Sequence, residues 1–231
     1  MGIAYNTKKI VTGNLVLYLD AANSKSYPGS GTSWSDLNNL ISSGTLTNGT
    51  TYSSSNNGYM SFDGVDDFVS FGDQKIVEVQ NKSVCAWIYR SADGILSIID
   101  KNFDSGDPNY GGWGFWLHTN NKLTLWVHRD KDLIDTGNAI PLNTWTHVAF
   151  SYSYSGKSVT FYINGAASST LTDATLVEKV SNTTALCVGS ARNGSLGFFN
   201  GRIGSVIVYG RTLSASEILH NYIATKARFG V

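Results

Sequence analysis

The sequence predicts an all-β protein in which two antiparallel sheets pack face to face, with one short helix near the C-terminus. Short apolar runs with alternating polar residues recur along the chain, and clusters of Gly, Asn, Asp and Ser separate them, which is typical of a sandwich. The 6 Trp, 12 Tyr and 10 Phe among 231 residues supply a large core for such a fold. We expect strands near residues 15–20, 59–63, 66–72, 83–90, 94–101, 112–118, 122–128, 144–152, 157–164, 184–190 and 200–209.

The expected helix lies close to the end of the chain. Ser214 and Glu217 form a capping-box pattern, in which the hydroxyl and the carboxylate each bond to a free backbone amide at the start of a helix. The residues that follow place an apolar stripe at helical spacing, namely Ile218, Leu219, Tyr222 and Ile223. We therefore predict a short helix that lies on the sandwich.

Nothing in the sequence divides the chain, because it contains no long linker, internal repeat or block of charge. All-β sandwiches of this length commonly form one unit. We predict one domain over residues 14–223, with an N-terminal arm over 1–13 and a C-terminal tail over 224–231, because chain ends stay loose unless they are tied down. Residues 29–58 and 102–111 are rich in Gly, Ser and Asn, which predicts long surface loops.

The charge balance excludes some partners. The chain contains 17 basic and 17 acidic residues, and a net charge of zero gives no electrostatic attraction to nucleic acid or to an anionic membrane surface. No apolar run reaches the ~20 residues of a membrane-spanning helix. The first residues include two lysines but no apolar stretch long enough for a signal peptide. We therefore expect no nucleic acid or membrane partner, and accumulation in the cytoplasm where the protein is made.

The two cysteines, Cys85 and Cys187, each lie in an apolar, strand-like run. Two cysteines in a chain of this length do not make a disulfide framework. We expect two buried thiols, because a free Cys behaves as a small apolar residue. A bridge between them stays open as an alternative for the case in which their strands are neighbours.

Four stretches of the chain carry a resemblance to a known fold family, and they occur in the family's order: FDGVDDFVSFG (62–72), SVCAWIYR (83–90), WTHVAFSYSYSGKSVTFYINGA (145–166) and FNGRIGSVIVYGRTLSASEI (199–218). Together they resemble the concanavalin A-like lectin/glucanase superfamily, in its laminin-G-like branch. The resemblance implies that the sandwich is a jelly roll. Sugar binders, sugar-cleaving enzymes and structural modules all use this fold, so the fold alone leaves the function open.

A second, narrower resemblance concerns the two ends of the chain. Residues 14–37 and 44–69, together with NYIATKARFG (221–230), are similar to jelly-roll proteins of tailed-phage virions. The fold does not demand these opening and closing segments. The resemblance implies a structural or decorating component of a phage capsid or tail. Such a protein is made in the host cytoplasm, is found in the virion in many copies, and has other virion proteins as partners.

The superfamily resemblance also implies where a catalytic site would lie. Its glycosidases carry an E-x-D-x-E or E-x-D-x-x-E motif, and the period of two in a strand places these carboxylates on one face. The three glutamates of this chain are Glu78, Glu178 and Glu217, and none begins such a motif. The four histidines lack the Q-x-H pattern of polysaccharide lyases. We therefore predict that the chain has no catalytic residue and is not an enzyme.

Residues 112–118 and 122–128 are expected to pair as two strands. A three-residue loop sets Leu117 opposite Leu123, which separates an apolar face from a face with rings and polar groups. That second face holds Trp116, His118, Trp126 and His128. Flat rings beside hydrogen-bonding groups are typical of sugar-binding sites, so host-surface carbohydrate is a candidate partner. The alternative is that a loop or the C-terminal helix covers this face, and the four residues then form a second small core.

Asp63, Asp66 and Asp67 lie close together in the stretch FDGVDDFV. Laminin-G-like relatives often bind calcium through Asp side chains and loop carbonyls at the edge of the sandwich, and hard oxygen ligands suit Ca²⁺. The resemblance therefore implies a candidate calcium site, and no other cofactor is expected. The alternative is structural, because Asp63-Gly64 is also an ordinary turn pattern and adjacent Asp residues suit the end of a strand.

Overall fold

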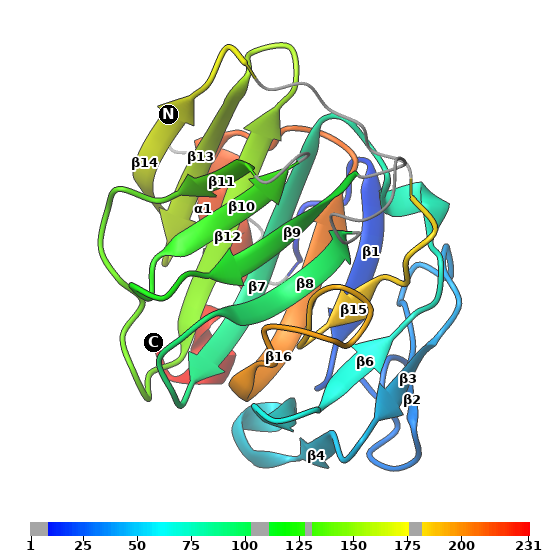
Figure 1. Ribbon diagram of the computed structural model, residues 1–231. Helices are drawn as coiled ribbons and strands as arrows, with labels where there is room; N and C mark the ends of the chain where they lie inside the picture. The colour runs from blue at the N-terminus through cyan, green and yellow to red at the C-terminus, as the bar shows by residue number, and fades with distance from the viewer. Residues whose placement is uncertain (1–8, 103–110, 128–130, 176–181) are drawn as a thin grey trace.

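The computed structural model describes residues 9–102, 111–127, 131–175 and 182–231. In this part of the chain two antiparallel sheets of eight strands each pack face to face, and one α-helix, α1 (Ala215–Thr225), lies outside them (Figure 1). The predicted all-β sandwich with a short C-terminal helix is therefore confirmed. No described helix is long and apolar enough to cross a membrane.

The first sheet, sheet A, is built around the ten-residue strand β16 (Asn200–Tyr209). Along one side β16 pairs with β7 (Lys82–Arg90), and along the other it pairs first with β5 (Tyr59–Asp63) and then with β1 (Leu15–Asp20). The sheet continues beyond these with β4 (Thr51–Ser53) next to β5, and with β12 (Thr146–Ser153), β13 (Ser158–Ile163) and β14 (Ala166–Thr172) next to β7. Strands from the beginning and the end of the chain thus meet in the middle of sheet A.

The second sheet, sheet B, runs in the order β11-β10-β9-β8-β15-β6-β3-β2. Its strands are β2 (Ser33–Trp34), β3 (Gly44–Thr47), β6 (Phe68–Ser70), β8 (Leu96–Asn102), β9 (Gly112–Leu117), β10 (Leu123–Val127), β11 (Lys131–Ile134) and β15 (Cys187–Val188). Every predicted strand overlaps one of the observed strands.

The prediction of a long surface loop over residues 29–58 is wrong, because this tract contains β2, β3 and β4. These strands, together with the unpredicted β11 and β14, lie at or next to the edges of the sheets. An edge strand needs one paired side and little burial, so its sequence lacks strong alternation. Strand β14, for example, reads AASSTLT and has no buried residue. Of the second predicted loop, residues 103–110 lie outside the described residues.

The core between the sheets is rich in aromatic rings. Alternate residues of the strands point inward, and the fully buried side chains there include Trp34, Trp113, Phe115, Phe150 and Phe161. The rings of Phe115 and Phe150 meet edge to face with centroids 5.0 Å apart. Such contacts between the two sheets fix their mutual position.

Both cysteines are buried and free. Cys85 lies in β7 of sheet A and Cys187 in β15 of sheet B, so their strands are not neighbours. Burial raises the pKa of each thiol to about 12. The prediction of two core thiols is confirmed, and the disulfide alternative falls.

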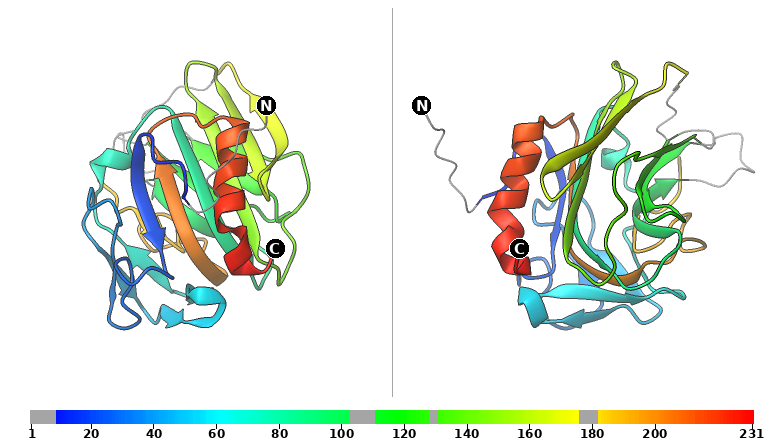
Figure 2. Two further views of the ribbon diagram at one scale, coloured as in Figure 1. Left: turned by 180° about the vertical axis from the view of Figure 1, so that it is seen from behind. Right: turned by 90° about the vertical axis from the view of Figure 1, so that its left-hand side faces the viewer.

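Helix α1 lies across the outer face of sheet A (Figure 2). It begins at the predicted capping box, in which the Ser214 hydroxyl accepts a hydrogen bond from the backbone N of Glu217 and Ser214 N donates to Glu217 Oε2 at 2.9 Å. The predicted apolar stripe is partly wrong. Ile218 is buried as expected, but Leu219 is 40% exposed, and the second buried residue is the polar Asn221.

The buried Asn221 side chain joins the N-terminal segment to the helix. Its Oδ1 accepts a hydrogen bond from Val11 N at 2.8 Å, and its Nδ2 donates to the Tyr209 hydroxyl at 3.0 Å. The Tyr209 hydroxyl donates in turn to Val11 O at 2.8 Å. The predicted loose arm is therefore wrong for residues 9–13, while residues 1–8 lie outside the described part of the chain.

The C-terminal residues also belong to the packed fold. After α1 the chain forms a 3₁₀ turn, η3 (Lys226–Phe229), and the Phe229 ring is buried. This ring stacks on Trp87 with centroids 4.3 Å apart and lies 4.7 Å from the ring of Trp145. The prediction of a separate tail over residues 224–231 is therefore wrong.

Candidate functional site

The two strands expected to carry an aromatic platform pair as predicted. β9 and β10 are neighbours in sheet B, with Leu117 opposite Leu123, and Asn121 in the connecting turn adopts a φ of 60°. The two leucines point into the core between the sheets. Trp116 and Trp126 therefore lie together on the outer face of sheet B.

A segment between β15 and β16, residues 189–199, lies over β15 and β8, next to β9 (Figure 1). Ala191 in this segment forms one buried cluster with Trp116 and Trp126. Trp116 and Trp126 are consequently only 6% and 2% exposed. The prediction of an exposed sugar platform at these rings is therefore wrong, and the alternative of a covered second core holds.

The two histidines assigned to the platform do not complete it. His118 follows β9 and is partly exposed, and its Nδ1 lies 3.0 Å from Oγ1 of Thr119. His128 lies outside the described residues. Of the four predicted residues, the structure brings together the two tryptophans.

A buried carboxylate that the sequence analysis missed joins the covering segment to the sheet. Asp100 in β8 accepts a hydrogen bond from Trp116 Nε1 at 2.9 Å, and the indole reaches it by lying over Gly114. The other carboxylate oxygen accepts from the backbone N of Arg192 at 3.0 Å and of Asn102 at 3.1 Å. Burial raises the pKa of Asp100 to about 6, although these donors favour the ionised form. The sequence feature that could have revealed this residue is an Asp at the end of the apolar run SIID (97–100).

The raised pKa of Asp100 predicts a measurable pH dependence of stability. An unfolded Asp titrates near pH ~4, so the folded protein binds this proton more tightly and gains stability as the pH falls from ~6 to ~4. About two pKa units correspond to about 3 kcal/mol. Urea titrations give the free energy of unfolding of the wild type and of Asp100→Asn at each pH. We expect the difference, wild type minus variant, to increase by about 3 kcal/mol as the pH is lowered from ~7 to ~4.

The comparison with Asp100→Asn isolates this group from the other carboxylates. Arg211, for example, lowers the pKa of Glu217 to about 2, and this pair loses stabilisation at low pH in both proteins. A difference that stays flat across the titration would show that Asp100 is not responsible.

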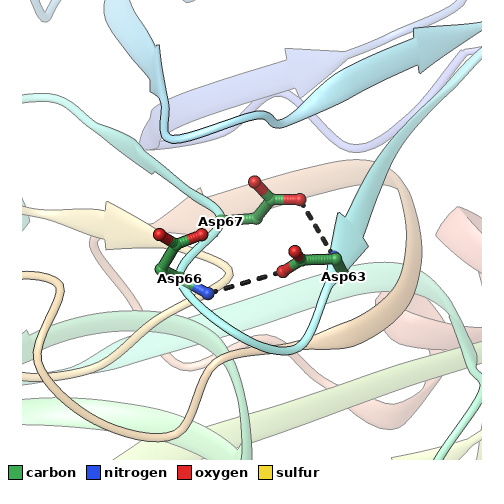
Figure 3. A group of neighbouring side chains, drawn as sticks. All are labelled: Asp63, Asp66 and Asp67. Carbon is green, nitrogen blue, oxygen red and sulfur yellow. Dashed lines mark hydrogen bonds between the residues drawn. The ribbon is translucent and has the colours of Figure 1, made fainter.

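Asp63, Asp66 and Asp67 come together at the rim of the sandwich, where the chain passes from β5 in sheet A to β6 in sheet B (Figure 3). One carboxylate oxygen of each lies within 4.8 Å of the others. Asp63 Oδ1 accepts a hydrogen bond from Val65 N at 2.8 Å, which is the turn expected from Asp-Gly. Asp67 Oδ2 accepts from the backbone N of Asp63 at 2.9 Å.

The charges of this acidic cluster are not balanced by a basic side chain, because no described Lys or Arg forms an ion pair with any of the three aspartates. Burial raises the pKa of Asp67, as do the charges of Asp63 and Asp66, while the hydrogen bond from Asp63 N lowers it. The second oxygen of Asp67, Oδ1, is buried and has no hydrogen-bond partner among the described residues. Three oxygen donors with one unpaired buried oxygen fit a hard divalent cation such as Ca²⁺.

Comparison with known proteins gives one family and several similar folds. The profile of the family described as the concanavalin A-like lectin/glucanases superfamily matches residues 63–219. No curated protein matches the sequence. Among solved structures, domain 4 of a GH43 extracellular arabinanase from Geobacillus stearothermophilus, in complex with arabinotriose, is 19% identical with a TM-score of 0.69. The match covers 92% of this chain and 100% of that domain.

Two further structures show the same fold within longer proteins. Trypanosoma rangeli sialidase in complex with sialic acid is 14% identical with a TM-score of 0.66, over 95% of this chain and 34% of the sialidase. The binding domain of Paraclostridial Mosquitocidal Protein 1 is 17% identical with a TM-score of 0.67, over 90% of this chain and 52% of that domain. The chain thus spans about a third and about half of these two proteins, and at such identities the likeness concerns the fold.

The prediction that the chain is not an enzyme is contradicted by these comparisons. The arabinanase and the sialidase are glycosidases, so this fold occurs inside sugar-cleaving chains. The missing E-x-D-x-E motif excludes one catalytic arrangement. The absence of this one motif does not decide whether the chain is an enzyme.

Proposed function

The chain belongs to the concanavalin A-like lectin/glucanases superfamily, and on this basis we propose that it is a carbohydrate-binding domain. From the resemblance of its opening and closing segments we propose that this domain is carried on a tailed-phage particle. The carbohydrate part depends on the acidic cluster of Asp63, Asp66 and Asp67 at the rim of the sandwich, with its unpaired Asp67 oxygen. The arabinanase domain that this chain matches over its whole length was solved with arabinotriose, which supports a sugar as the ligand.

The three aspartates would hold the cation between the surface and the sandwich. Asp67 is buried and offers its oxygen from the inner side, while Asp63 and Asp66 are exposed. Ca²⁺ takes about six to eight oxygen ligands, so three carboxylates leave positions for other oxygens. The bound ion supplies a positive centre for the hydroxyl groups of a sugar.

The place on a phage particle, capsid or tail, depends on the resemblance of residues 14–37, 44–69 and 221–230. In the structure β1 and the C-terminal turn from these segments adjoin each other, because Arg228 pairs with Asp20. Partners on the particle would be other virion proteins. With zero net charge, apolar and hydrogen-bonded contacts are the expected ones. Many copies on one virion, made in the host cytoplasm, would turn a weak sugar affinity into useful avidity.

Replacing Asp67 by Asn is expected to weaken calcium binding at least ten-fold, because the variant keeps the side-chain size but loses the charge. Isothermal titration calorimetry measures this, with a wild-type Kd of roughly 0.1–1 mM as in extracellular calcium modules. Asp173→Asn is a matched control, since Asp173 is a partly exposed turn residue after β14, at the opposite edge of sheet A. A wild type without calcium binding, or equal binding by Asp67→Asn, contradicts the cation site.

A glycan array tests the function itself. With excess calcium, the wild type should bind a defined set of glycans. This binding should disappear when a chelator removes the calcium, and Asp67→Asn should not show it. Binding to no glycan contradicts the carbohydrate part. Incubating the same glycans with the protein and assaying new reducing ends shows whether they are also cleaved.

Mass spectrometry of washed phage particles tests the proposed place on the virion. Absence of the protein from these particles contradicts that place.

A further inference from the structure

On the outer face of sheet A one arginine is held between two tyrosine rings. Arg202 in β16 has its Cζ 4.4 Å from the ring centroid of Tyr89 and 5.0 Å from that of Tyr59. The register explains this arrangement, because Arg202 pairs with Tyr89 on one side and with Ser61 on the other. Tyr59 lies two residues from Ser61 and therefore on the same face. The two rings fix the position of the guanidinium before any ligand arrives.

The guanidinium of Arg202 has no acceptor among the residues that the structure describes. It forms no hydrogen bond or ion pair there, and its contacts are the two rings. Asp63 is the next carboxylate along this face, opposite Asn200, and no ion pair joins it to Arg202. A guanidinium presents five N–H donors in a planar fork that matches a carboxylate. The side chain is partly exposed, so this fork is open to a ligand.

A third ring with an unpaired donor adjoins the arginine. The ring centroid of Trp145 lies 5.7 Å from those of Tyr59 and Tyr89. Trp145 is 7% exposed, and its Nε1 has no hydrogen-bond partner in the described part of the chain. An indole N–H can only donate, so this buried N–H lacks an acceptor that a ligand oxygen could supply.

We propose that Arg202, Tyr59, Tyr89 and Trp145 form a subsite for the carboxylate-bearing units of an acidic polysaccharide. The fork of Arg202 binds the carboxylate in a bidentate pair, and the partly exposed ring of Tyr89 contacts the apolar face of the sugar. The rings of Tyr59 and Trp145 are buried, 8% and 7% exposed, and they hold Arg202 and Tyr89 in place from below. The inference rests on the proposed carbohydrate binding and adds the class of sugar, a uronic acid. Asp63 repels an anion here, so the bidentate pair and the Tyr89 ring provide the affinity.

Nuclear magnetic resonance of the indole N–H groups tests this subsite directly. Each of the six tryptophans contributes one indole N–H signal, and Trp145→Phe identifies the one from Trp145. We expect sodium glucuronate to move this signal with a Kd of roughly 1–10 mM, and glucose and sodium acetate to act at least ten-fold more weakly. Arg202→Gln should weaken glucuronate binding ten-fold or more. Arg202→Lys should weaken it several-fold, because Lys keeps the charge but lacks the fork.

Control variants distinguish binding at this subsite from a non-specific effect of positive charge and from binding at the proposed calcium site. Lys25→Gln removes an exposed charge elsewhere and should change nothing, and unchanged melting temperatures show that the Arg202 variants are folded. Asp67→Asn should leave the glucuronate shift intact, so failure of the calcium site and failure of this subsite are distinguishable. The proposal is overturned by an unmoved Trp145 signal, by equal effects of glucose or acetate, or by undiminished binding in Arg202→Gln.

Discussion

Replacing Trp87 by Ala is expected to lower the free energy of unfolding by about 3–5 kcal/mol, one of the two largest effects that we predict for a single truncation. The ring is fully buried against sheet A, and it stacks on Phe229 at 4.3 Å and on Tyr222 at 5.9 Å. Its Nε1 also donates to Thr225 Oγ1 at 2.8 Å. The truncation therefore leaves a cavity beneath both the helix and the C-terminal turn.

Urea unfolding followed by circular dichroism measures the effect of this truncation. Trp87→Phe keeps most of the stacking and loses the hydrogen bond, so it should cost less than Trp87→Ala. Leu142→Ala is the matched surface control, because Leu142 is exposed, and it should stay within about 0.5 kcal/mol of the wild type. Cooperative unfolding of Trp87→Ala near the wild-type midpoint would contradict the role of the C-terminal residues in the fold.

Trp116→Ala should destabilise the protein by a similar amount, about 3–5 kcal/mol. The change removes the ring under residues 189–199 and leaves Asp100 without its indole donor. A buried carboxylate that loses a hydrogen bond adds to the cost of the cavity. An exposed ring in a sugar platform would contribute little to stability, so this measurement also separates the two interpretations of this face.

Trp116→Phe divides the effect of Trp116→Ala into its two causes. The phenyl ring retains part of the contact with Ala191 but cannot donate to Asp100, which isolates the hydrogen bond at about 1–3 kcal/mol. Wild-type stability in both variants would show that residues 189–199 do not cover the ring in solution.

The two faces of a strand could be predicted from the sequence, but the segment that covers a face could not. Alternation and turn chemistry gave the register of Leu117 with Leu123 and the direction of Trp116, as the structure confirms. Residues 189–199 are distant in sequence and have no periodic pattern. Arg192 and Asn193 adopt positive φ there. Their position depends on a hydrogen bond to Asp100, which is a tertiary contact.

The ends of the chain also show that local sequence patterns do not reveal contacts between residues that are distant in sequence. The capping box of α1 is a local pattern, so Ser214 and Glu217 predicted the start of the helix correctly. Helical spacing alone favoured the apolar Leu219 over Asn221, because it cannot show that Asn221 bonds to Val11 more than two hundred residues earlier. The acidic cluster was predictable because its three residues lie within one turn.

The central place of β16 has a consequence for how the protein is made. Leu15 in β1 pairs with Tyr209, and β5 and β7 also pair with β16. At about 5–20 residues per second on the ribosome, roughly 10–40 s pass between the synthesis of β1 and that of β16. During this time the unpaired edges of the earlier strands are open to other nascent chains. Slow translation or early truncation before residue 200 is therefore expected to yield aggregates, and chaperone capacity in the producing cell should limit the yield of soluble protein.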